Sequence, residues 1–107
     1  MSKWQSALAV YEIAEEAETS YERDVWTPSY DVAVNGGPNI PDHVDAEIER
    51  LASIRCDAEE QLITTSAPNL SAVIWKIEYA RKRWKDFEDW PDAWWAAVLG
   101  DLRHLAA

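Results

Sequence analysis

The 107-residue chain has little of several residue types, and each shortage narrows the classes it can belong to. Its single cysteine, Cys56, excludes an internal disulfide and a cysteine metal cage, which agrees with a reducing compartment. No apolar run approaches the roughly 20 residues that a membrane-spanning helix needs. Residues 1 to 20 also lack the pattern of a secretory signal. We therefore expect a cytoplasmic protein with no membrane contact.

Basic side chains are scarce, at 10 against 20 acidic ones, so the net charge is -10. The imbalance is uneven, because residues 1–69 hold 14 acidic and 4 basic side chains whereas residues 70–107 hold 6 of each. A negative surface repels phosphates and attracts basic surfaces. The sequence therefore argues against direct binding of nucleic acid and favours a protein partner.

The sequence also has few of the residues that form catalytic or metal sites. Asp101-x-x-His104 is a single near match to the Glu-x-x-His motif that di-iron bundles use twice, and His43 has no acid three residues before it. Cys56 has no histidine and acid placed to activate it, and Gly36-Gly37 is no phosphate loop. We predict no catalytic, cofactor-binding or metal residue, no cofactor and no enzyme activity.

Tryptophan, by contrast, is abundant, with seven residues in this short chain. A tryptophan ring buries about 150 to 250 Å² when it enters a core. At about 25 cal/mol per Å² of apolar surface, a few such rings can anchor a small fold. We expect most of the seven to be core residues.

Residues 70–105 predict a helical hairpin, because apolar residues recur three and four positions apart. Glu88-Asp89-Trp90-Pro91 should separate the two helices, since proline interrupts one helix and is favoured at the start of another. The first helix has two core positions per heptad, occupied by Leu70, Ile77 and Trp84 and by Val73, Ala80 and Phe87. The second has a stripe of Trp94, Trp95, Val98, Leu102 and Leu105.

Two further helices precede this hairpin. The first has a small-residue seam, and the second begins near Pro41 or Asp42. Thr27-Pro28 should end the first helix, leaving a long loop over 27–39 with a turn at Gly36-Gly37-Pro38. The seam of the first helix is Ala7, Val10, Ala14, Ala17 and Tyr21, and the stripe of the second is Val44, Ile48, Leu51, Ala58 and Leu62.

The expected helices cover about residues 2–25, 41–64, 70–88 and 91–106, which predicts one all-α domain. Amphipathic helices of this length with mostly short connections are typical of an antiparallel four-helix bundle. A three-helix core with an N-terminal helical arm is the alternative. The alternation of Tyr30, Val32 and Val34 also leaves open one short extended piece in the long loop.

Arg55 falls in the middle of an apolar stripe, where an unpaired charge is costly. We predict an ion pair between Arg55 and an acid of the first helix: Glu15, Glu18 or Glu22. Arg81 lies on the seam side of its helix, and we expect it to pair with an acid as well.

A recognition patch is the main functional hypothesis at the level of residues. Trp75 and Tyr79 lie one helical turn apart, away from the Leu70 seam, and Lys82 and Arg83 continue that side. Aromatic and basic residues are enriched where proteins meet, in a complex or a homodimer, and aromatic rings also stack on bases. The alternative is that this helix is buried on both sides. Trp26 and Tyr30 could pin the long loop or contact a partner.

Several segments together show a resemblance to a known group of proteins. They are Ile40-Pro41, Glu49 to Leu51, Ala67-Pro68, Ala72, Lys76 and Asp101-Leu102-x-x-Leu105. Over about residues 40–105 the chain resembles small uncharacterised helical proteins encoded in bacterial prophage-like or mobile regions. The resemblance implies an accessory or inhibitory protein and transfers no activity, cofactor or catalytic residue.

These observations predict a small acidic helical protein that acts by binding another protein. The alternative is an acidic inhibitor that imitates nucleic acid and occupies the basic groove of a DNA- or RNA-handling enzyme, such as phage-defence machinery.

Overall fold

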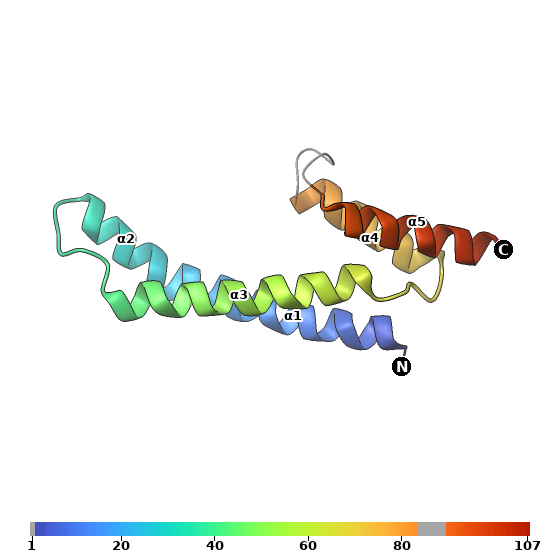
Figure 1. Cartoon of the computed structure of the whole chain (residues 1–107). Coiled ribbons are helices and arrows are strands. Elements are labelled where there is room, and N and C mark those ends of the chain that lie inside the picture. The colour runs from blue at the N-terminus through green and yellow to red at the C-terminus, as the bar shows by residue number, and fades with distance from the viewer. Residues whose placement is uncertain (1, 84–89) are drawn as a thin grey trace. The chain divides into compact units, whose positions relative to one another are not determined.

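The computed structural model describes residues 2–83 and 90–107, and all regular secondary structure in these ranges is helical (Figure 1). The predicted all-α class is confirmed. The elements are α1 (Lys3–Tyr21), the π-helix η1 (Glu22–Trp26), α2 (Thr27–Val34), α3 (Asp42–Thr64), α4 (Leu70–Arg83) and α5 (Asp92–Ala106). Because α1, η1 and α2 follow one another without a break, the described residues form four helical runs, as many as predicted.

The predicted loop over 27–39 is wrong for its first eight residues, which form α2. Proline normally clashes with the carbonyl four residues earlier. Here the preceding turn widens into η1, in which the amide of Thr27 donates to the carbonyl of Glu22, five residues back. The hydroxyl of Ser29 donates to the carbonyl of Val25 at 2.8 Å, so another carbonyl of the widened turn has a donor. The helix therefore passes through Pro28 instead of ending there.

The predicted turn at Gly36-Gly37-Pro38 is confirmed, and its two glycines have separate reasons. Gly36 has φ +87°, a left-handed conformation that glycine adopts without steric cost. The amide of Gly37 donates to the carbonyl of Val32 at 2.9 Å, the closing bond of a Schellman motif. A side chain at Gly37 would lie 2.5 Å from the Val32 side chain. Both positions therefore favour glycine.

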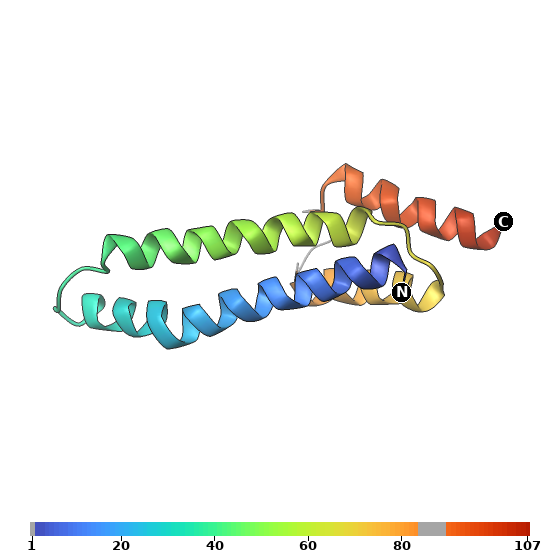
Figure 2. The ribbon, with the colours of Figure 1, turned by 90° about the horizontal axis from the view of Figure 1, so that it is seen from below.

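The chain divides into two compact units, and the division falls within α1 and α3. Unit 1 comprises Met1–Leu8 and Glu59–Ala107, and unit 2 comprises Ala9–Ala58. In unit 2 the run from α1 through α2 lies antiparallel to α3, as Figures 1 and 2 show. In unit 1 α4 packs against α5, also antiparallel (Figure 1). The packing of all four runs into one bundle stays a prediction.

The core of unit 1 contains most of the buried side chains. Of the predicted stripes, Val73, Ala80, Trp94 and Val98 are buried. Leu70 and Leu102, however, are exposed, at 58% and 38%. The buried residues of α4 are Ala72, Val73, Lys76 and Ala80. The buried face is therefore centred on Lys76 and not on the predicted Leu70 seam.

The core of unit 2 is small, with Tyr11, Ala14, Val44 and Ala58 buried. The seam predicted for α1 is therefore only partly correct, since Val10 is 59% exposed and Ala17 is exposed. α1 is apolar on two sides, and burial favours the side with the larger ring of Tyr11. The other apolar side stays in solvent.

The tryptophans behave largely as expected. Trp4, Trp90 and Trp94 are buried, and the other three described tryptophans are half-buried. Trp84 and Phe87, placed in the predicted hairpin, lie outside the described residues. Within residues 2–83 and 90–107, no helix combines the length and the apolar character needed to cross a membrane.

Candidate protein-binding surface

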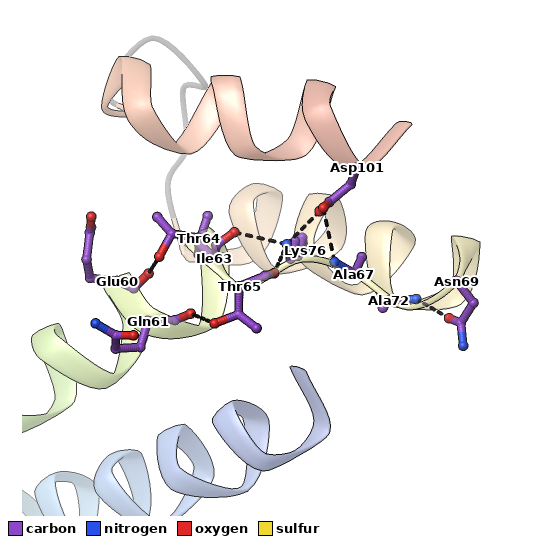
Figure 3. A network of polar contacts seen from close by, with 10 residues as sticks. All are labelled: Glu60, Gln61, Ile63, Thr64, Thr65, Ala67, Asn69, Ala72, Lys76 and Asp101. Carbon is purple, nitrogen blue, oxygen red and sulfur yellow. Dashed lines mark hydrogen bonds and ion pairs between the residues drawn. The ribbon is translucent and has the colours of Figure 1, made fainter. Parts of the chain in front are cut away.

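A buried polar network lies at the centre of unit 1 (Figure 3). Lys76 is fully buried, and its Nζ donates to the carbonyls of Ile63 at 2.9 Å and Thr65 at 2.8 Å and to Asp101 Oδ2 at 2.6 Å. An ammonium group has three hydrogens, so these three acceptors use all of its donors. The charge is satisfied inside the protein and is not offered to a ligand.

The same network fixes the turn between α3 and α4. Asp101 Oδ1 accepts a hydrogen bond from the amide of Ala67 at 3.0 Å, so one carboxylate holds both the turn and Lys76. Asn69 Oδ1 accepts a hydrogen bond from the amide of Ala72 at 3.0 Å and so caps α4. Asp101, the acid of the weak metal motif, is thereby committed to a structural role.

The predicted recognition patch does not form as an exposed surface. Trp75 is half-buried, stacks on Tyr79 at a centroid distance of 5.2 Å, and meets the edge of Trp4 at 5.7 Å. Tyr79 donates to Glu59, a glutamate of α3 that is only 4% exposed. The aromatic part of the patch is therefore occupied by contacts within unit 1, which was the alternative interpretation.

The basic part of the patch is divided. Arg83 Nε lies 3.6 Å from Glu59 Oε2, so it contributes to the same internal cluster, while Lys82 is exposed. The neighbouring Glu60 accepts a hydrogen bond from Trp94 Nε1. The contacts of Glu59 and Glu60 with these side chains were not predicted, because in the sequence both residues are only part of the acidic surplus of residues 1–69.

Trp26 of η1 connects its helical run to α3, and Tyr30 of α2 stacks on Trp26. Their rings stack at 5.3 Å with an interplanar angle of 12°, and Trp26 Nε1 donates to Asp45 Oδ1 at 3.1 Å. Of the two roles that the sequence left open, Trp26 takes the pinning one, although both residues lie on helices rather than in a loop. Tyr30 also remains 45% exposed.

The predicted ion pair of Arg55 is confirmed, with Glu18 as the acid. Arg55 Nε lies 3.1 Å from Glu18 Oε1, and the two side chains are only 12% and 14% exposed. Glu15 is half-buried and Glu22 is exposed. Arg81 is exposed, and the ion pair expected for it stays a prediction.

Unit 2 carries almost the whole charge surplus of the chain. It contains 12 acidic and 3 basic side chains, a net charge of -9, whereas unit 1 contains 8 acidic and 7 basic ones. All three arginines of unit 2 are already paired inside it, Arg23 with Asp24, Arg50 with Glu47 and Arg55 with Glu18. The exposed acids of unit 2 without an ion pair among the described residues are Glu12, Glu16, Glu22, Asp31, Asp42, Glu49 and Asp57.

Two of the paired acids are held in the ionised form. Hydrogen bonds from Arg50 lower the pKa of the Glu47 carboxyl below its ordinary value of 4.5, and those from Arg23 lower the pKa of Asp24 below 3.8. Both pairs lie at the surface, so water and salt screen them strongly. Unit 2 thus presents a persistent negative surface at neutral pH.

Other candidate chemistry finds no grouping in residues 2–83 and 90–107. No set of three histidine, cysteine or acidic side chains there is arranged to hold a metal ion. His43, Cys56 and His104 are each exposed. The acidic surface of unit 2 is the feature with the clearest capacity for binding.

Comparison with known proteins gives this chain no relatives: no model of a protein family, no curated protein and no solved structure matches it.

Proposed function

We propose that this protein acts by binding a second protein that carries a basic surface, and that unit 2 is the part that binds. The observation that supports the proposal is the net negative charge of unit 2. It contains 12 acidic and 3 basic side chains, and each basic side chain already forms an ion pair with an acid of the same unit. Complementary charge speeds encounter and selects partners. Nucleic acids and anionic membranes carry the same sign of charge and would be repelled.

The proposal includes the cellular location and the genetic origin that the sequence suggested. A cytoplasmic accessory protein of a prophage-like or mobile element would find its partner among the proteins of that element or of the host cell. It would act by occupying a surface of the partner, without catalysis of its own.

The test is capture of partners on the immobilised protein from a lysate of the source cells, at two salt concentrations. Raising the salt from about 0.1 M to about 1 M shortens the Debye length from about 10 to about 3 Å. Proteins bound through unit 2 should be basic, and most should be lost at high salt. Retention of the same proteins at both concentrations, or capture of acidic proteins, contradicts the proposal.

Two matched variants locate the binding unit. Glu49→Gln with Asp57→Asn removes two exposed charges from unit 2 and should weaken capture. Glu78→Gln with Asp92→Asn removes two exposed charges from unit 1 and should leave capture unchanged. The reverse result would assign the binding to unit 1.

Imitation of nucleic acid is the second candidate, favoured by the seven exposed acids of unit 2 that form no ion pair with a described base. If this candidate is correct, the captured partner binds DNA or RNA, and a short duplex competes with this protein for binding to the partner. If the duplex does not displace the captured partner, the result supports ordinary protein binding and excludes imitation of nucleic acid.

A further inference from the structure

One face of α1 in unit 2 is apolar and exposed. Val10 is 59% exposed and Ile13 is 72% exposed, the highest exposed fraction of any large apolar residue in the described chain. Ala9 and Ala17 lie one turn before and after Ile13 on the same face. Together these four residues form the α1 stripe. An isolated exposed apolar residue is ordinary, whereas a continuous row is a feature of binding surfaces.

The α1 stripe is part of an open, shallow surface formed by Ala9, Glu12, Ile13, Glu16, Ala17 and Ser20, all of them residues of α1. Glu12 and Glu16 lie one helical turn apart along its edge, both exposed. The edge is therefore acidic and the floor apolar. The stripe with its edge extends from Ala9 to Ser20, which is about 18 Å of helix, or three turns.

The packing of unit 2 leaves this face without a partner inside its own unit. The opposite side of α1 carries Tyr11 and Ala14, which are buried, and Glu18, which pairs with Arg55 of α3. The sequence pattern placed Val10 and Ala17 in the core seam, but the structure uses the Tyr11 side instead. The apolar residues at 10, 13 and 17 thus contribute nothing to the core.

We propose that the α1 stripe is the docking site for an amphipathic helix of the partner, one that presents an apolar row with lysine or arginine along its edge. This inference rests on the proposed function and names the residues that would carry it. The apolar row would cover Val10 and Ile13, and its basic edge would meet Glu12 and Glu16. Amphipathic helices that dock through an apolar face make their contacts through residues three and four apart.

Charge selects this occupant over a second copy of the chain. A homodimer through the α1 stripe would bring together two units of net charge -9. Like charges across an interface cost free energy, whereas opposite charges steer the partner into register. A cationic helix gains from both the apolar floor and the acidic edge.

The probe is a fluorescent model peptide of about 15 residues, long enough for four helical turns, with leucines on one face and lysines along both edges. Its affinity is measured by fluorescence anisotropy against the full chain. Wild-type protein should bind it, and the same peptide with glutamate in place of lysine should not bind.

Ile13→Ser should weaken binding of the lysine peptide about tenfold, because one apolar anchor is lost. Serine and isoleucine have similar helix propensity, and Ile13 is mostly exposed, so helicity and melting temperature should stay the same. Ile54→Ser is the matched control, since Ile54 is a 44% exposed isoleucine on α3 of the same unit. The control should bind like the wild type.

Glu12→Gln with Glu16→Gln should weaken binding about two- to fivefold at low salt and leave it unchanged at high salt, as expected of edge charges. If the glutamine variant weakens binding while Ile13→Ser does not, the α1 stripe is not the docking site, but binding of a basic partner by unit 2 still stands. If neither the glutamine variant nor salt changes binding, the proposed function itself fails. If sedimentation shows that the wild type self-associates and that Ile13→Ser abolishes this, the stripe binds a second copy and the inference is overturned.

Discussion

The two units of this protein differ in the number of side chains that they bury and in their net charge. Thirteen side chains are buried in the described part of unit 1, against four in unit 2. Unit 2, with fewer residues, holds a net charge of -9, whereas unit 1 holds -1. Buried apolar area stabilises a fold, whereas a one-sided charge opposes compaction and serves association. The difference agrees with the proposal that unit 2 binds a partner, while unit 1 holds most of the buried core.

The polar contacts follow the same division. In unit 1 the charges of Lys76 and Asp101 are sealed in the core, where they fix the α3 to α4 turn. In unit 2 the mostly buried pair of Arg55 and Glu18 crosses between α1 and α3, and Trp26 adds one hydrogen bond to Asp45. Most of the remaining acids of unit 2 are exposed. Substitutions in the two units should therefore differ in size and in kind.

The largest effect is expected from replacing both Trp75 and Tyr79 with serine. The change removes a stacked aromatic pair and the hydroxyl that donates to buried Glu59. We expect a loss of about 5 kcal/mol, comparable to the whole stability of a small domain. Thermal melting followed by circular dichroism measures it. Tyr30→Ser in unit 2 should cost only about 1 kcal/mol. An unchanged melting temperature of the double variant would return these rings to a recognition role.

Next in size is Lys76→Met, which leaves the Asp101 carboxylate buried without its cation. Removing one member of a buried ion pair costs about 3 to 5 kcal/mol. Urea unfolding should show this loss, whereas Lys82→Met, on the exposed side of the same helix, should stay within about 0.5 kcal/mol.

A double variant, Lys76→Met with Asp101→Leu, sharpens this prediction. Because the unpaired charge is gone, part of the lost stability should return, although the amide of Ala67 still loses its acceptor. If the double variant is as unstable as the sum of the two single changes, the ion pair itself is not the source of the effect.

Arg55→Met should have an intermediate effect, about 2 kcal/mol, because the pair with Glu18 is mostly but not fully buried. Glu18→Gln keeps an acceptor for the guanidinium and should cost about 1 kcal/mol. Chemical denaturation measures both. Arg50→Met, which breaks an exposed pair with Glu47, is the control and should change stability very little. Equal effects of Arg55→Met and Arg50→Met would show that burial does not separate the two pairs.

The smallest effect concerns pH. The pKa of Glu47 is lowered in the folded protein by hydrogen bonds from Arg50. A carboxyl with a lowered folded pKa stabilises the fold above its unfolded pKa, and that contribution is lost as the pH falls through the folded value. NMR titration should place the pKa of Glu47 below 4.5 in the wild type and near 4.5 in Arg50→Met. The same pKa in both proteins would show that Arg50 does not lower it.

Local rules predicted those parts of the fold in which one residue decides the outcome. The turn at Gly36-Gly37-Pro38 formed as predicted, and Arg55 within an apolar stripe has its acid on α1. The rule that Thr27-Pro28 ends a helix failed, because it cannot anticipate the wide turn of η1 that accommodates the ring.

Two misses concern which face of a helix is buried. Lys76 lies three residues after Val73 and four before Ala80, so the reasoning applied to Arg55 could have found its burial. Its partner Asp101 lies three residues after buried Val98 in the same way. The same reasoning could not show which face of α1 is exposed, because Val10 and Tyr11 lie on two different apolar sides of the helix. Only tertiary packing decides which of these sides is buried. The α1 stripe was therefore identified from the structure and not from the sequence.

The most direct test of the division between the units is hydrogen exchange of the full chain, free and saturated with the lysine peptide. In the free protein, amides of α4 and α5 should exchange most slowly, since they lie in the larger core. Bound peptide should slow exchange in residues 9–20 and leave residues 70–83 unchanged. Slower exchange over residues 70–83 instead, or no change in residues 9–20, would contradict the assignment of binding to unit 2.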